Sequence, residues 1–313
     1  MSARHHRAQS DLVVFVEFPP AIEHIAARFP DVTVIDISSG VPEGSRAEVL
    51  FGGLSPHSSE AMASGVRWVQ SVGTGIDALS PQIRAAPILT SARGASAVAI
   101  SEYVIASMGA FARQFPKNWL EAPPEHWNYQ PASVLAGSTL SLFGFGGIAQ
   151  RIARIAVAME IEVVAMRRRP EPSPFDGVTM VGTLSELVSV ADHLVIAAPA
   201  TQLTHHVIDD DAFAMMRPGV HLVNIARAAL LDQDALARAL DNGIVGRASL
   251  DVTDPEPLPA GHWLYSHPKV FLTPHASWCG PAPLSGAIEI FLDNLGRYLA
   301  NEELIGLVGD QDY

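Results

Sequence analysis

Three polar side chains of complementary type follow apolar runs in the second half of the chain. They are Arg227 after Val220–Ile225, Glu256 after Ala248–Asp251, and His275 after Val270–Thr273. If these runs are parallel strands, their carboxyl ends line one ligand crevice. An imidazole there can protonate a developing alkoxide, a carboxylate on its second nitrogen favours the protonated ring, and a guanidinium can bind a carboxylate. The three side chains therefore predict hydride transfer to a carbonyl compound.

A glycine-rich turn lies earlier in the chain, directly after the apolar run Leu140–Phe143. Its residues are Gly144, Phe145, Gly146, Gly147, Ile148 and Ala149. Gly144 permits a tight turn, Gly146 lets a pyrophosphate approach the backbone, and Ala149 is small enough for a helix to pack on its strand. The helix that begins here offers free N–H groups to phosphates. A turn that serves packing alone is the alternative, and the strand–turn–helix context favours a dinucleotide site.

Three consecutive arginines follow the second apolar run of the predicted dinucleotide site, at the position that determines whether NAD or NADP binds. A site for NAD places Asp or Glu at the end of the second strand, where it binds the ribose hydroxyls. Here Arg167, Arg168 and Arg169 follow Glu162–Met166, and no carboxylate directly follows that run. Because arginine binds phosphate bidentately, the sequence predicts NADP as the preferred cofactor. NAD is the alternative, since a solvated basic turn could accept either.

Short apolar runs rich in Val and Ile must position these side chains. The candidate strands are Leu12–Glu17, Val32–Ile37, Glu48–Phe51, Trp68–Val72, Ile88–Thr90, Leu140–Phe143, Glu162–Met166, Val178–Val181, Leu194–Ala197, Val220–Ile225, Ala248–Asp251 and Val270–Thr273. Several are apolar on successive residues, which is typical of strands covered by helices on both faces. The alternation with helical stretches predicts βαβ units in doubly wound parallel sheets. A TIM barrel has the same alternation, and the glycine-rich turn favours the open sheet.

The composition excludes several classes of partner. The chain has 313 residues, about two domains' worth, and a formal charge of −13, which argues against nucleic acid and anionic membranes as partners. No apolar run approaches the ~18 residues that span a bilayer. The single Cys279 excludes an intramolecular disulfide, and we expect it to be a buried small apolar residue. A cytoplasmic protein is the prediction.

Twelve histidines raise the question of a metal site. None of them forms a His-x-x-x-His or HExxH pattern, so no metal is predicted. His205 and His206 are adjacent and would point to opposite sides of a helix or strand. His193 and His221 open two strands, and we expect them to be hydrogen-bonded residues at the edge of the core.

Four motifs in order resemble the D-isomer-specific 2-hydroxyacid dehydrogenases, over nearly the whole length of the chain. The first is the glycine-rich turn, and the others read Asn224-Ile-Ala-Arg227-Ala228, Asp251-Val-Thr-Asp-Pro-Glu256-Pro257 and Pro274-His275. The separations, 29 residues from Arg227 to Glu256 and 19 from Glu256 to His275, are also similar to those of the family.

The resemblance implies a role for each matching position. His275 would be the general acid/base, Glu256 its partner, and Arg227 the residue that binds the carboxylate of the 2-oxo acid. The remaining assignments are Asp251, Ile225 and Ala226 near the nicotinamide, Pro199 and Thr204 on the cofactor side, and the backbone of Gly73, Thr74 and Gly75 on the substrate carboxylate.

The resemblance also implies the architecture. A Rossmann dinucleotide-binding domain, residues 101–283, would be inserted in a flavodoxin-like substrate domain formed by residues 1–100 and 284–313. Members of the family are commonly dimers through the nucleotide domain, so a homodimer is expected, with Pro116–Pro131 as a candidate arm.

Departures from the family pattern narrow the substrate. Ala149 and Ala228 replace glycines, and both are small. The segment Phe51–His57 lacks the Arg-Ser-rich sequence by which phosphoglycerate dehydrogenases hold a phosphorylated substrate. The sequence therefore predicts a glyoxylate/hydroxypyruvate-type reductase that interconverts a small 2-oxo acid and its D-2-hydroxy acid. The alternatives are a formate dehydrogenase, although those members have an amide in place of Glu256, and a nucleotide-sensing, corepressor-like binding protein.

Overall fold

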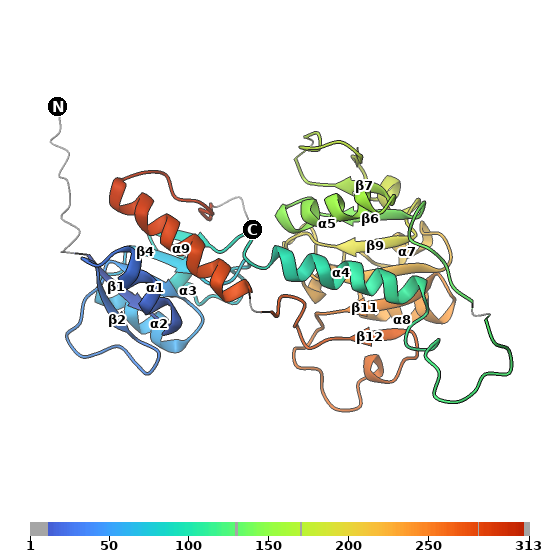
Figure 1. Ribbon diagram of the computed structural model, residues 1–313, viewed down its shortest axis with the longest axis horizontal. Helices are drawn as coiled ribbons and strands as arrows, with labels where there is room; N and C mark the ends of the chain where they lie inside the picture. Colours follow the sequence, from blue (N-terminus) through green and yellow to red (C-terminus); the bar gives the residue numbers. More distant parts are fainter. Residues whose placement is uncertain (1–11, 129–130, 170, 281, 310–313) are drawn as a thin grey trace. The chain divides into compact units, whose positions relative to one another are not determined.

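The computed structural model describes residues 12–128, 131–169, 171–280 and 282–309. The chain forms two compact units (Figure 1). Of the described residues, the first contains those up to Ser96 and those from Gly280 to Gly309, and the second contains those from Ala97 to Cys279. Each unit is built around one parallel sheet.

The sheet of the first unit has five strands in the order β2-β1-β3-β4-β5. Their bounds are β1 Val13–Val16, β2 Thr33–Asp36, β3 Val49–Gly52, β4 Trp68–Ser71 and β5 Ile88–Ser91. This order is that of flavodoxin, in which the chain winds first to one side of β1 and then to the other. The flavodoxin-like fold predicted for this part of the chain is confirmed.

Helices of the first unit begin where the sequence favours a helix start. They are α1 Pro20–Arg28, α2 Pro56–Ala61, α3 Pro81–Arg84 and α9 Ala282–Ala300, with a 3₁₀ turn at Met62–Ser64. Proline stands at the start of α1, α2 and α3, where its missing N–H is not needed. The long helix α9 packs on the sheet through Phe291, whose ring stacks 4.6 Å from that of Phe51.

The sheet of the second unit has seven strands in the order β12-β11-β10-β9-β6-β7-β8. Their bounds are β6 Thr139–Phe143, β7 Glu162–Met166, β8 Val178–Val181, β9 His193–Ile196, β10 Val220–Asn224, β11 Val245–Leu250 and β12 Val270–Leu272. The direction of winding reverses between β6 and β9, as it does in the Rossmann fold, and β12 adds a short seventh strand at one edge. The predicted doubly wound sheet is confirmed.

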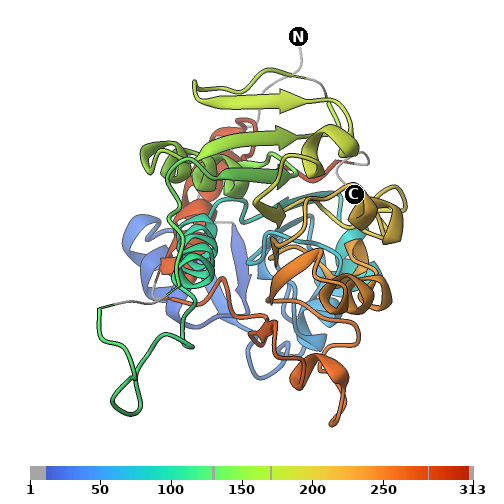
Figure 2. The ribbon, with the colours of Figure 1, turned by 90° about the vertical axis from the view of Figure 1, so that its right-hand side faces the viewer.

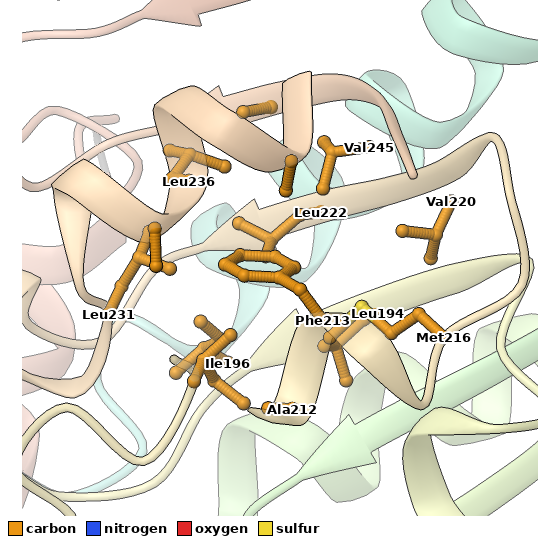
Figure 3. Packing of buried hydrophobic residues seen from close by; sticks show 14 of the residues in the cluster. Leu194, Ile196, Ala212, Phe213, Met216, Val220, Leu222, Leu231, Leu236 and Val245 are labelled. Atoms are coloured by element: carbon orange, nitrogen blue, oxygen red, sulfur yellow. The ribbon is translucent and has the colours of Figure 1, made fainter. Parts of the chain in front are cut away.

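Helices cover both faces of this second sheet. They are α4 Ala97–Ala112, α5 Gly147–Ala158, α6 Leu184–Val188, α7 Asp210–Ala214 and α8 Gln233–Asp241, with 3₁₀ turns at Ala228–Leu230 and Trp263–Tyr265. Helices α4 and α5 pack on one face through residues such as Val104 and Ile152. On the other face Phe213 packs among Leu222 and Leu236 (Figure 3). Because both faces are apolar, the strands have the continuous apolar pattern seen in the sequence.

All twelve candidate strands of the sequence correspond to strands of the structure. Glu162–Met166 and Val178–Val181 match β7 and β8 residue for residue, and the others agree with the predicted runs apart from shifts at their ends. The assignment of a substrate role to one unit and a dinucleotide role to the other stays a prediction at this point.

Candidate active site

Three neighbouring strands bring the predicted catalytic residues to one edge of the second sheet. Strand β11 pairs in parallel with both β10 and β12, so the carboxyl ends of all three strands lie together. Arg227, Glu256 and His275 follow these ends in turn. The expectation that three strand ends converge there is met by the topology.

His275 and Glu256 form a direct pair. The His275 Nδ1 lies 2.9 Å from Glu256 Oε2, and both side chains remain partly open to solvent, with 41% and 39% of their surface exposed. The other carboxylate oxygen, Oε1, accepts a hydrogen bond of 2.9 Å from the backbone N–H of Thr253. The carboxylate is therefore held between the imidazole and its own loop, and the Nε2 side of the ring is left for a reacting group.

The backbone at His275 is bent into the left-handed region, with φ of +50°. A non-glycine residue is strained there and needs support from its surroundings. The support comes from Asp251, whose carbonyl oxygen accepts from His275 N at 2.9 Å. Trp278 Nε1 also donates to the His275 carbonyl at 2.8 Å. The turn that carries His275 is thus fixed from both sides.

Asp251 anchors the turn that carries His275. Its side chain is 1% exposed. Oδ1 accepts from Thr273 Oγ1 at 2.6 Å and from Ala276 N at 2.7 Å, while Oδ2 accepts from Ser277 N at 2.9 Å. A buried carboxylate needs such donors, and these hold the turn in place. The family-derived position of Asp251 near the nicotinamide stays a prediction.

Two residues of this network were missed by the sequence analysis. Tyr103, on α4, has its hydroxyl 2.9 Å from Thr273 Oγ1, which in turn donates to Asp251. Burial raises the pKa of the Tyr103 phenol, so the phenol is neutral at physiological pH. The only sequence signal was a tyrosine in an otherwise apolar helix and a threonine two residues before the histidine.

The loop that carries Arg227 is braced by Asn224 at the end of β10. Asn224 Oδ1 accepts from Ala226 N at 3.1 Å, and its Nδ2 donates to the Arg227 carbonyl at 3.0 Å. Arg227 Nη1 donates to the Ala226 carbonyl at 2.7 Å. Ile225 is buried, and its N–H donates to Ile196. The fully buried side-chain amide of Asn224 therefore fixes the turn that carries Arg227.

The glycine-rich turn joins β6 to α5 as predicted. Gly144 has φ of +98°, and a Cβ there would lie 2.6 Å from the backbone nitrogen of Ala198. Only glycine fits this close approach of two chain segments. Phe145 is buried in the same hydrophobic cluster as Ala149 of α5, and Ala149 has the packing role expected of it.

The start of α5 fits a dinucleotide phosphate. Gly146 is the N-cap residue of α5. Because glycine has no side chain, no side-chain hydrogen bond caps the first turn of the helix. A Cβ on Gly146 or on Gly147 would meet no described atom within 4 Å, so open space faces the helix N-terminus. Uncapped N–H groups beside open space are what a pyrophosphate requires. Ile148 follows in the first turn of the helix.

The arginines after β7 differ from one another in their surroundings. Arg167 Nη2 donates to Glu171 Oε2 at 2.6 Å and to the Pro172 carbonyl at 3.2 Å, and its side chain is half-buried. Arg168 and Arg169 are exposed. No carboxylate directly follows β7 in the sequence, but the chain folds back so that Glu171 lies against Arg167. The Arg167 guanidinium is therefore partly neutralised by Glu171.

Two further predicted segments have well-defined local structures. Thr204 Oγ1 donates to the Pro199 carbonyl at 2.8 Å and accepts from Thr201 N at 2.8 Å, which closes the loop after β9. In the first unit, Gly73 N donates to Ser71 Oγ at 3.3 Å, and Thr74 Oγ1 donates to the Ala92 carbonyl at 3.4 Å. Gly75 is half-buried in the same loop. Their ligand roles stay predictions.

Two minor expectations are wrong. Cys279 is exposed, because it lies in the irregular segment just past the His275 turn. The rings of His205 and His206 stack at 4.0 Å, because the left-handed backbone at His206, with φ of +48°, turns them to the same side. Within the described part of the chain, no group of three or more His, Cys, Asp or Glu side chains could hold a metal ion.

Comparison with known families gives the decisive observation. Residues 105–277 match the family described as D-isomer specific 2-hydroxyacid dehydrogenase, NAD binding domain. The chain belongs to this family. The stretch includes Arg227, Glu256 and His275, and the family is one of oxidoreductases.

Individual relatives agree with this membership. The chain is 32% identical over 225 residues to D-3-phosphoglycerate dehydrogenase 2 of Arabidopsis thaliana, covering 69% of this chain but only 35% of that protein. It is 29% identical to glyoxylate/hydroxypyruvate reductase A of Serratia proteamaculans, covering 70% and 73% of the two chains. A solved family protein from Aeromonas salmonicida is 26% identical, with a TM-score of 0.81 and coverage of 95% and 99%.

The helices also bear on the class of protein. Among the residues that the structure describes, none of the helices combines the length and the apolar character needed to cross a bilayer.

Proposed function

We propose that the protein is an NAD(P)-dependent oxidoreductase that interconverts a small 2-oxo acid and its D-2-hydroxy acid. The observation that carries this proposal is the 2.9 Å pair of His275 and Glu256. It lies at the same strand-end edge as Arg227, within a stretch that matches an NAD-binding family domain.

His275 acts as the acid/base. The ionised carboxylate of Glu256 can only accept a hydrogen bond, so Nδ1 of the imidazole carries the hydrogen between them. This fixes Nε2 as the atom that exchanges a proton with the substrate oxygen. The carboxylate also stabilises the imidazolium. This proton-coupled arrangement favours carbonyl chemistry over formate oxidation, in which no oxygen takes up a proton.

Arg227 binds the carboxylate of the substrate. A guanidinium matches a carboxylate in a bidentate geometry and polarises the adjacent carbonyl. The Asn224 hydrogen bonds keep its loop in one conformation, so the charge is positioned before the substrate arrives. We also assign the backbone N–H groups of Gly73, Thr74 and Gly75 to substrate carboxylate binding.

The dinucleotide is held by the glycine-rich turn. When bound, the nicotinamide gives or accepts the hydride. The open space at Gly146 and Gly147 and the uncapped start of α5 receive the pyrophosphate. The other residues assigned to the dinucleotide are Gly144, Phe145, Ile148, Ala149, Pro199, Thr204, Ile225, Ala226 and Asp251.

The arginine segment makes NADP the preferred cofactor. Arg168 and Arg169 are exposed and can bind the 2′-phosphate, while Arg167 is held by Glu171 and supports the segment. Glu171 is engaged by Arg167, which removes a carboxylate that could otherwise favour the ribose hydroxyls of NAD.

A small, non-phosphorylated substrate such as glyoxylate or hydroxypyruvate fits best. Glu17 Oε2 lies beneath the loop after β3, where it accepts from Gly53 N at 2.8 Å, Leu54 N at 3.1 Å and Ser58 Oγ at 2.7 Å. This carboxylate takes up the donors that the loop could offer and disfavours a second anion there. The reductase from Serratia, whose name gives glyoxylate and hydroxypyruvate, supports the same substrate class.

The test is an assay panel of glyoxylate, hydroxypyruvate and phosphohydroxypyruvate with NADPH and with NADH. We expect the highest kcat/KM for a non-phosphorylated acid with NADPH. Arg168→Gln/Arg169→Gln should raise the KM for NADPH about tenfold and leave that for NADH unchanged, because each lost charge-assisted bond weakens binding. Arg84→Gln/Arg217→Gln, which removes two exposed arginines elsewhere, is the control. No turnover of any 2-oxo acid would refute the activity, and a preference for NADH would refute the cofactor assignment.

Quaternary structure and location complete the proposal. We propose a cytoplasmic homodimer. Residues 113–128 form a loop that leaves the end of α4 (Figure 2), and its apolar side chains Trp119, Leu120 and Trp127 are more than half exposed. Exposed aromatic side chains are enriched in protein interfaces. Light scattering should give the mass of two chains, and Trp119→Ser/Trp127→Ser should reduce it to that of one.

A further inference from the structure

A cavity lies at the amino-terminal ends of β11 and β12, whereas the residues assigned to catalysis follow the carboxyl ends of these strands. Its volume is about 640 Å³. It is bounded by the end of α4 and the start of β11 and β12, and its walls include Phe111, Lys117, Arg247, Lys269 and Phe271.

The charges of this cavity set it apart from the rest of the chain. The sequence contains two lysines, Lys117 and Lys269, and both line this one cavity although they are far apart in the chain. Arg247 is the third cation. Among the described residues that line it, none is acidic, in a chain with 33 acidic and 20 basic residues. A cavity with three cations and no lining carboxylate has a local potential opposite to that of the molecule.

Arg247 is held ready for a ligand. Its guanidinium lies 4.1 Å from the centre of the Phe271 ring and 5.6 Å from that of Phe111. Nη2 donates to the Phe115 carbonyl at 3.1 Å. Burial lowers the pKa of Arg247, which reflects the cost of desolvating this cation. The aromatic rings fix the orientation of the guanidinium and provide an apolar surface beside it.

Lys269 is also partly fixed. Its Nζ donates to the Leu240 carbonyl at 2.5 Å, which uses one of three donor hydrogens. A carbonyl satisfies a hydrogen bond but does not neutralise the charge. Lys117 is exposed, so its long side chain can adapt to a ligand.

The cavity is distinct from the catalytic site. Arg247 is near the start of β11 and Asp251 follows its end. The two residues are four positions apart along the chain, which corresponds to about 13 Å at 3.3 Å per residue. A ligand in the cavity therefore does not contact the residues assigned to the substrate.

We propose that this cavity binds a small organic anion with two or more negative charges, such as a tricarboxylate or a phosphate ester. The lysines and Arg247 neutralise the anionic groups, and Phe111 and Phe271 contact the apolar part of the ligand. The proposal does not depend on which 2-oxo acid the enzyme reduces.

Calorimetric titration with citrate and with pyrophosphate tests the proposal. The protein is first saturated with NADP⁺ so that the phosphate positions of the dinucleotide site are filled. We expect one equivalent of citrate or pyrophosphate to bind per chain, and acetate, a monoanion, to bind at least tenfold more weakly. Lys117→Gln/Lys269→Gln should weaken the binding about tenfold or more, since two charged donors are lost.

The controls separate this cavity from other sources of anion binding. Arg84→Gln/Arg217→Gln changes the net charge equally and should leave the Kd within about twofold. Lys117→Arg keeps the charge and should retain the affinity, and Lys117→Gln alone tests the cavity without disturbing the Lys269 bond. Absence of binding by both polyanions, or equal weakening in both double variants, would overturn the proposal. So would loss of the dimer in Lys117→Gln/Lys269→Gln without any anion binding, because the lysines would then pair with carboxylates of a second copy.

Discussion

Two side-chain pairs that contain histidine have opposite surroundings in the same unit. In the exposed pair, His275 lies 2.9 Å from the carboxylate of Glu256 at a strand end. In the buried pair, His193 and His221 lie on neighbouring strands β9 and β10, with their Nδ1 atoms 3.1 Å apart. His221 Nε2 is 2.9 Å from Ser249 Oγ, and the ring of Phe111 stacks on His221 at 4.7 Å.

The difference shows how the environment selects the role of a histidine. Burial lowers the pKa of His193 to about 4 and also holds the pKa of His221 well below its ordinary value. Both rings of the buried pair are therefore neutral near pH 7 and serve as hydrogen-bonding parts of the core. His275, with a carboxylate on one nitrogen and solvent near the ring, is the one suited to move protons.

The largest expected effect breaks the exposed pair. His275→Gln should lower kcat for 2-oxo acid reduction by about 10²–10⁴-fold, because the acid/base is lost. The Kd for NADPH and the melting temperature should change little, since the side chain is 41% exposed. Kinetics, fluorescence titration and calorimetry measure the three quantities. His205→Gln, at an exposed histidine elsewhere, is the control, and retained turnover in His275→Gln would remove it from the mechanism.

The second prediction is that the buried pair of His193 and His221 makes the free energy of unfolding depend on pH. The folded pKa of His193 lies below its unfolded value of 6.5, so the unfolded chain takes up the proton first as the pH falls. The contribution of the neutral His193 ring to the free energy of unfolding is complete above pH 6.5. It is lost as the pH falls toward 4, by up to about 3 kcal/mol. His221 acts in the same direction.

Urea unfolding at pH 7.5, 6 and 5 measures this loss of stability. His193→Gln should flatten the dependence of the unfolding free energy on pH. Equal slopes in the wild type and His193→Gln would contradict the assignment of His193 as a buried neutral ring.

The smallest expected effect sharpens the role of the carboxylate. Glu256→Gln keeps the shape of the side chain but does not stabilise the imidazolium. We expect kcat for reduction to fall about tenfold. Steady-state kinetics with saturating NADPH measure kcat, and Glu171→Gln, which leaves His275 untouched, is the control. An unchanged kcat in Glu256→Gln would remove the carboxylate from the mechanism.

Much of the fold could be predicted because the strands are short, apolar and bounded by turns. Glu162–Met166 is a strand in both the prediction and the structure. The order of the strands could not be obtained in the same way, because β6 pairs with β9, which lies far along the chain. That pairing places β10, β11 and β12 side by side and so assembles the site.

The candidate site was predictable where residue type at a strand end carried the signal, as for Arg227, Glu256 and His275. It was not predictable where contacts depend on chain reversal or side-chain direction. Glu171 reaches Arg167 only because the chain turns back after β7. Tyr103 reaches Thr273 across the sequence from another element. Short-range pattern does not encode either contact.

The short edge strand β12 links thermal behaviour to chemistry. It consists of Val270–Leu272, pairs with one neighbour only, and leads directly into the turn of His275. A short edge strand unfolds locally more readily than the interior strands of a sheet. Mild heating should therefore abolish turnover while most of the helices are still folded, because β12 unfolds locally before the whole protein melts.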